Sequence, residues 1–111
     1  MEITVKTVLD EFVDGLSEIF KDKLIQVILF GSYARGDFEE YSDIDVMILV
    51  DMRDEEIKKL TKDVVEVSCK LDTDYDNLLS PIITDIQHFK RWLPTLPFYK
   101  NVVDEGVIVY G

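Results

Sequence analysis

The stretch FGSYARGDFEEYSDIDVMILV, residues 30–50, decides the fold of this 111-residue chain. It joins two apolar runs, LIQVILF at 24–30 and DIDVMILV at 43–50, through a polar segment that is rich in turn residues. Short apolar runs with many β-branched residues are typical of buried strands. The sequence therefore predicts two neighbouring strands joined by a polar turn segment that is a candidate functional site.

Two acidic residues interrupt the second predicted strand. Asp43 and Asp45 are separated by one residue, and successive side chains of a strand alternate between its faces. We therefore expect both carboxylates on one face, with Ile44 and Val46 on the other. Two neighbouring carboxylates repel each other, and a bound Mg²⁺ removes the conflict because hard cations prefer carboxylate oxygens.

A glycine and a serine follow the first predicted strand. Gly31 lets a phosphate approach the backbone closely, and Ser32 offers a hydroxyl and an N–H group to phosphate oxygens. A P-loop is excluded although Gly31 and Gly36 have its glycine spacing. Asp37 and Phe38 occupy the positions where that motif needs lysine and Ser or Thr.

The rest of the chain predicts helices and strands in the approximate order αβ(turn)βαβα. The expected elements are an amphipathic helix at 4–23, a second helix within 51–71, a strand at 75–84, a short helix at 85–93, a further helical turn or two at 96–106 and a final extended piece at 107–111. Pro81 cannot donate to a ladder, so its strand is expected at an edge or at a bulge. The fold class is α/β (α+β), with a small mixed sheet of about three strands flanked by helices.

Composition limits the classes of function. A chain of 111 residues suggests one domain, residues 1–111. The net charge of −11 disfavours autonomous nucleic-acid binding and suits a basic protein partner. One cysteine, no signal-like start and no membrane-length apolar run lead us to expect a cytoplasmic protein with no membrane association.

The glycine turn and the paired aspartates together resemble a known signature. GSYARG at 31–36 followed by SDID at 42–45 is similar to the motif of the polymerase-β-type nucleotidyltransferase superfamily. In a chain of this length the resemblance is to the minimal nucleotidyltransferases (MNT). Many of these are encoded beside HEPN-domain proteins, some as antitoxins. The motif covers about 20 residues, and the order of elements extends the resemblance over most of the chain.

The resemblance implies a mechanism. Gly31 and Ser32 would hold the triphosphate of an NTP, expected to be ATP, and Asp43 and Asp45 would bind two Mg²⁺ ions, with Mn²⁺ as an alternative. An NMP, expected to be AMP, would pass to an acceptor hydroxyl with release of pyrophosphate. Arg35 would either contact the triphosphate or hold the loop through ion pairs.

A third carboxylate is also implied, to share a metal and to help deprotonate the acceptor. It is expected on the third strand, near LDTDYDNLLSPIIT. Asp76 is our choice because it lies next to the apolar run, and Asp74 is the reserve. The nearby aromatic residues Trp92, Phe98 and Tyr99 are expected to close the core rather than to stack on a base.

Three functions remain compatible with these residues. The first is an active NTP transferase, whose acceptor would be a small molecule or a HEPN-type protein partner. The second is an acidic binding module that neutralises a basic partner without chemistry. The third is a nucleotide sensor that binds NTP and metal without transfer. The intact pair Asp43 and Asp45 favours the enzyme.

Overall fold

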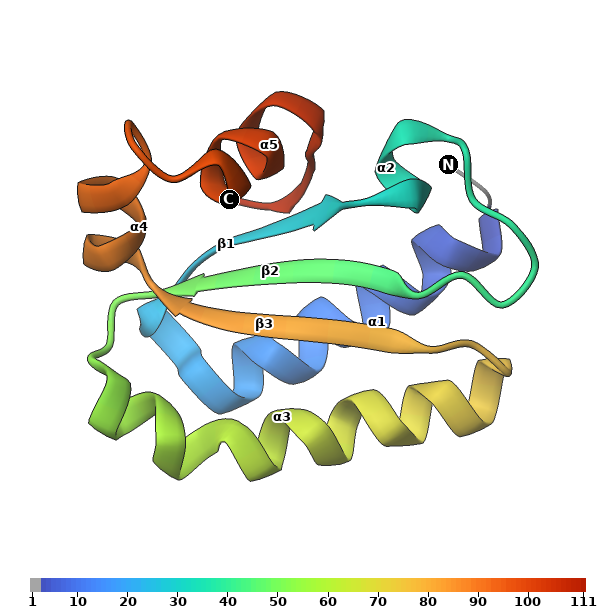
Figure 1. Ribbon diagram of the computed structural model, residues 1–111. Coiled ribbons are helices and arrows are strands. Elements are labelled where there is room, and N and C mark those ends of the chain that lie inside the picture. The colour runs from blue at the N-terminus through green and yellow to red at the C-terminus, as the bar shows by residue number, and fades with distance from the viewer. Residues whose placement is uncertain (1–2) are drawn as a thin grey trace.

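The computed structural model describes residues 3–111 as a sheet with helices on both faces (Figure 1). Within this range the sheet has four strands in the order β3-β2-β1-β4. The strands are β1 at Leu24–Phe30, β2 at Ile44–Val50, β3 at Leu79–Asp85 and β4 at Val107–Tyr110. The expected mixed α and β architecture is confirmed, but the expected number of strands was too small.

The helices divide between the two faces of the sheet. Their bounds are α1 at Ile3–Phe20, the 3₁₀ turn η1 at Lys21–Lys23, α2 at Ser32–Arg35, α3 at Asp54–Tyr75, α4 at Ile86–Trp92 and α5 at Pro97–Glu105. Figure 1 shows α1 and α3 below the sheet, and α4 and α5 above it. The short helix α2 lies at the end of β1, between the two strands that carry the motif.

The strand pairing is mixed. β1 pairs antiparallel with both β2 and β4, whereas β2 pairs parallel with β3 through the crossover helix α3. Phe30 lies opposite Asp45 in the first ladder, and Asp45 lies opposite Ser80 in the third. The carboxyl end of β1 and the amino end of β2 therefore meet at one end of the sheet, as an antiparallel pair requires.

Each face of the sheet has its own apolar layer. Ile44, Val46 and Ile48 of β2 pack in the larger cluster with residues of α1 and α3, such as Phe12. Met47 of the same strand packs in a smaller cluster with residues of α4 and α5. The alternation along β2 thus separates the two layers, and the smaller layer shares its face with Asp45.

The terminal elements account for the differences from expectation. β4 is short and its side chains are mostly exposed, so its sequence lacks the strong apolar signal of a buried strand. The strand with Pro81 lies at the edge of the sheet, as expected, and begins at Leu79 rather than at Tyr75. Asp85 caps α4, because its carboxylate accepts a hydrogen bond from the N–H group of Gln87 at 2.9 Å. Within residues 3–111, none of the helices is long and apolar enough to cross a bilayer.

Candidate active site

Gly31 forms the turn between β1 and α2 in a conformation that suits glycine alone. Its φ of 75° and ψ of −155° lie in a region that other residues rarely adopt. A Cβ atom at this position would collide with the Asp45 carboxylate. The carbonyl of Gly31 accepts hydrogen bonds of 3.1 Å from the N–H groups of Ala34 and Arg35, which starts the helical turn at Ser32. Glycine therefore brings the backbone of the turn into contact with the acidic strand.

Asp45 lies as the alternation of β2 predicts, and Asp43 precedes the strand. Ile44 and Val46 are buried against α1 and α3, so Asp45 projects from the opposite face. Asp43 is exposed directly before the strand, and Asp45 is half-buried. Burial raises the pKa of the Asp45 carboxyl, the nearby Asp43 raises it further, and Arg35 lowers it. Asp43 is thus close enough to oppose the ionisation of Asp45.

Arg35 lies at the end of α2 and forms two ion pairs. Its Nε atom is 3.2 Å from the Asp37 carboxylate, and its Nη1 atom is 3.1 Å from Oε2 of Glu105. The second pair connects α2 to the end of α5. Of the two roles that the sequence left open for Arg35, the structure contains the ion pairs, and the contact with phosphate stays a prediction.

One cavity contains most of the predicted site. Its volume is about 380 Å³, and Gly31, Ser32, Arg35 and Asp45 line one side of it. The other side is formed by residues of α5 and by Phe30 at the end of β1. The glycine-serine turn and the second aspartate of the motif therefore open into the same space, which is within the size range of small-molecule sites.

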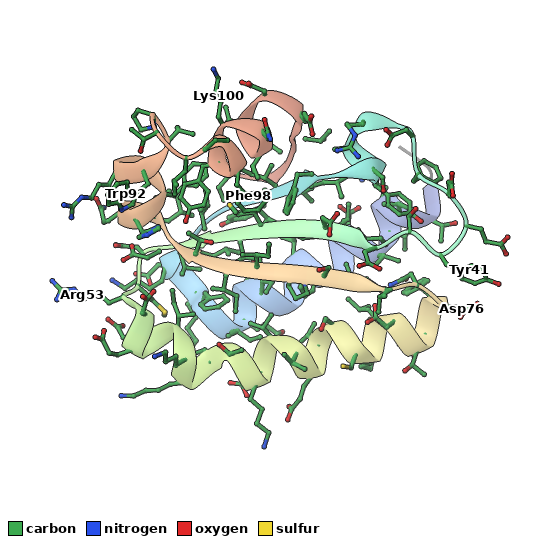
Figure 2. The ribbon with its side chains drawn as sticks, in the orientation of Figure 1. Tyr41, Arg53, Asp76, Trp92, Phe98 and Lys100 are labelled. Atoms are coloured by element: carbon green, nitrogen blue, oxygen red, sulfur yellow. The ribbon has the colours of Figure 1, made fainter. Side chains whose placement is uncertain are left out.

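Asp76 lies elsewhere, and its predicted place in the third strand was wrong. α3 continues to Tyr75, and Asp76 ends it in the left-handed conformation, with φ of 51°. Asp76 lines a larger, separate cavity of about 530 Å³, together with Tyr41 and Asn77. Figure 2 shows Asp76 beside Tyr41 at the outer end of α3, well away from Phe98.

The other acidic residues of this segment have local partners. Asp74 is on α3 and pairs with Lys70 at 3.4 Å. Asp72 accepts hydrogen bonds of 2.8 Å from the Asn77 side chain and from the N–H group of Leu79, and so holds the turn from α3 to β3. Across residues 3–111, no three Asp, Glu, His or Cys side chains gather closely enough to hold a metal ion. Asp43 and Asp45 thus form a pair, and Ser80 occupies the position on β3 opposite Asp45.

Sequence reasoning missed the contribution of α5. Phe98, Asn101 and Glu105 line the cavity that contains Asp45. Their spacing along α5 is three and four residues, which places them on one side of a helix. The sequence carried this signal, but only the packing of α5 on the sheet shows which side of the helix faces the motif.

Comparison with known proteins identifies the family of the chain. The sequence profile of the nucleotidyltransferase domain family matches residues 9–109 of this chain. The chain therefore belongs to the nucleotidyltransferase domain family, and it is a nucleotidyltransferase, whose substrate class is the nucleoside triphosphates.

The particular relatives include two proteins of Methanocaldococcus jannaschii that are named as candidate protein adenylyltransferases. One is 41% identical over 102 residues, which is 92% of this chain and 95% of that protein. The other is 33% identical over 100 residues, which is 90% of this chain and 92% of that protein.

Solved structures share the fold at lower identity. The structure of a candidate minimal nucleotidyltransferase has a TM-score of 0.55 at 19% identity, and the match covers 93% of each chain. A chain of the MntA-HpeT toxin-antitoxin complex has a TM-score of 0.58 at 20% identity, covering 93% of this chain and 73% of that one. A chain of a Shewanella oneidensis complex between a tri-AMPylated HEPN toxin and its MNT antitoxin has a TM-score of 0.54 at 19% identity, covering 96% and 71%.

Proposed function

We propose that this protein transfers AMP from ATP to a hydroxyl group of a protein acceptor and releases pyrophosphate. The observation that carries the proposal is the shared cavity of Gly31, Ser32 and Asp45. A turn that can hold phosphate and a carboxylate that can hold a cation are the two requirements for a bound metal–nucleotide complex. The relatives named as candidate protein adenylyltransferases support AMP as the transferred group.

Asp43 and Asp45 fit a divalent cation, Mg²⁺ or Mn²⁺. Burial of Asp45 and its repulsion by Asp43 raise the pKa of Asp45 although Arg35 lowers it, so a bound cation would favour the ionised carboxylate. Oxygen ligands of this kind are those that hard cations prefer. When bound, such ions stabilise negative charge on the attacking and leaving oxygens of phosphoryl transfer.

The residues of the chain would position the triphosphate. The Ser32 hydroxyl would donate to a phosphate oxygen, and Gly31 would leave room for phosphate beside the backbone. Arg35, at the mouth of the cavity, would exchange an acidic partner for phosphate. The acceptor oxygen then bonds to the α-phosphorus, the bond from that phosphorus to the bridging oxygen breaks, pyrophosphate leaves, and the acceptor proton passes to water.

A HEPN-type protein is the proposed partner and acceptor. Support comes from the similar chains found in complexes that are described as toxin-antitoxin pairs, one of which contains an AMPylated HEPN toxin. The net charge of −11 suits a basic partner surface. The protein would then act as the antitoxin of the pair by modifying its partner.

Labelled-nucleotide transfer tests the proposal. The protein is incubated with Mg²⁺ and ATP labelled at the α-phosphate, with and without the HEPN-type protein encoded beside it, and label on protein and released pyrophosphate are measured. We expect both products to need intact Asp43 and Asp45. Absence of label and of pyrophosphate with every NTP, with both proteins present, would refute the proposal.

A non-catalytic binding module is the second candidate. The strong negative charge favours it, as does the finding that no third acidic side chain within residues 3–111 gathers with Asp43 and Asp45 closely enough to hold a metal ion. The double variant Asp43→Asn with Asp45→Asn separates the two functions. Full neutralisation of the partner by this variant would favour binding alone, whereas loss of neutralisation with retained binding would favour transfer.

A further inference from the structure

Helix α5 forms part of the wall of the cavity that contains the motif residues. Phe98, Asn101 and Glu105 of α5 line this wall, opposite Gly31 and Asp45. Figure 2 shows Phe98 between α5 and the sheet. An NTP has a part that metals and phosphate donors do not contact, namely its nucleoside. The wall is therefore the place where the rest of the substrate would lie.

Phe98 is not one of the buried residues of α5. Tyr99 and Val102 are the buried residues of this helix, at 8% and 1% exposed, and they join the smaller apolar layer with Met47. Phe98 remains 45% exposed, contrary to the expectation that it closes the core. A large apolar ring that lines a cavity and stays half-exposed is available to a ligand.

The position of the Phe98 ring is nevertheless fixed. It makes an edge-to-face contact with Phe30, with centroids 5.6 Å apart and an interplanar angle of 78°. Phe30 directly precedes Gly31 and pairs with Asp45 across the ladder. The aromatic ring is thus held next to the turn that would bind phosphate, where a base attached to that phosphate could stack on it.

Asn101 supplies the polar group that such a wall needs. It lies one helical turn after Phe98, is exposed, and lines the same cavity. A side-chain amide offers one donor and one acceptor, and this pair matches the amino group and the adjacent ring nitrogen of adenine. Guanine presents an oxygen acceptor and a ring N–H donor at the corresponding edge, so the amide would have to reverse to pair with it.

We propose that Phe98 and Asn101 form the nucleoside subsite and select adenine, Phe98 by stacking and Asn101 by bidentate hydrogen bonding. This inference rests on the proposed function and adds to it the residues that choose the base. Glu105 lines the same wall and forms an ion pair with Arg35 across the cavity.

Binding measurements on the full chain test the subsite. The probes are an ATP analogue that resists cleavage after the α-phosphate, the matching GTP analogue and inorganic tripolyphosphate, each with Mg²⁺, followed by calorimetry. We expect Phe98→Ala to weaken the affinity for the ATP analogue about tenfold, within the range for a base stacked on an aromatic ring. The affinity for tripolyphosphate should stay within about twofold of that of the wild type. Val103→Ala is the matched control, because Val103 is 50% exposed on α5 and is outside the set of residues that line the cavity.

Asn101→Asp makes the test independent of folding, since the two side chains have nearly the same shape. A carboxylate accepts from both N–H groups on the edge of guanine but from only one group of adenine. We expect the ratio of ATP to GTP affinity to fall by about tenfold or more, which a merely structural role of Asn101 would not produce. An unchanged ratio, or equal loss of tripolyphosphate and ATP affinity in Phe98→Ala, would overturn the subsite alone. A wild-type protein that binds no nucleotide and transfers no label would overturn the proposed function together with it.

Discussion

Replacement of Gly31 by alanine is the sharpest test of the site geometry. At φ of 75° and ψ of −155° an alanine would be strained by up to about 3 kcal/mol, and its Cβ would also displace the Asp45 carboxylate. With roughly 4 °C lost for each kcal/mol in a domain of this size, we expect a fall in Tm of about 12 °C or more. Displacement of Asp45, the proposed metal ligand, by about 1 Å should lower the transfer rate by about 100-fold. Thermal melting curves and the labelled-ATP assay measure the two effects.

Gly36→Ala is the matched control for this variant. Gly36 has φ of 84°, but a Cβ atom there meets nothing within 4 Å. Alanine in this left-handed conformation should cost about 1–2 kcal/mol, or about 4–8 °C in Tm, and should leave most of the transfer activity. The reasoning would be refuted if Gly31→Ala kept the wild-type rate and lost no more stability than Gly36→Ala.

Three further substitutions test other parts of the structure. Asp45→Asn should abolish transfer yet raise Tm at pH 7. Burial and Asp43 raise the pKa of Asp45 in the folded state above its value in the unfolded state. The stability of the wild type therefore falls as pH rises between these two pKa values, and asparagine removes this loss. Melting curves should show this gain vanish below about pH 4, where both states hold the proton, and a gain that persists there would contradict the explanation. Phe12→Ala, at a fully buried position of α1, should cost about 3–5 kcal/mol in urea titrations, and a loss below about 1 kcal/mol would contradict the packing of the larger layer. Glu105→Gln should change stability by less than about 1 kcal/mol, since the ion pair with Arg35 is exposed to water, and a larger change in thermal melts would mean that this pair fastens α5.

Local patterns predicted the first half of the chain well. The strand at 24–30 has the predicted bounds. Its mostly apolar run ends at Gly31, where the backbone turns into α2. The projection of Asp45 away from the buried Ile44 and Val46 followed from the two-residue period of a strand. These features depend on neighbours in the sequence, and so the sequence alone was sufficient to predict them.

The errors arose where distant contacts decide the structure. The segment DTDYD is polar enough for a loop, but Thr73 and Asp74 continue α3, with an i, i+4 pair to Lys70 that supports the helix. Asp76 was therefore placed in a strand that begins three residues later. The half-exposed ring of Phe98 depends on how α5 docks, which no local period in the sequence specifies.

The docking of α5 also has a consequence for how ligand and folding are linked. One wall of the cavity comes from the turn between β1 and α2, and the other from a helix much later in the chain. A fragment that contains only the signature motif would lack the wall formed by α5 and would have little affinity for nucleotide. Saturating nucleotide should instead shift the melting of the whole molecule upward by mass action, so a simple dye-based thermal screen of nucleotides could rank the natural substrates before any acceptor is known.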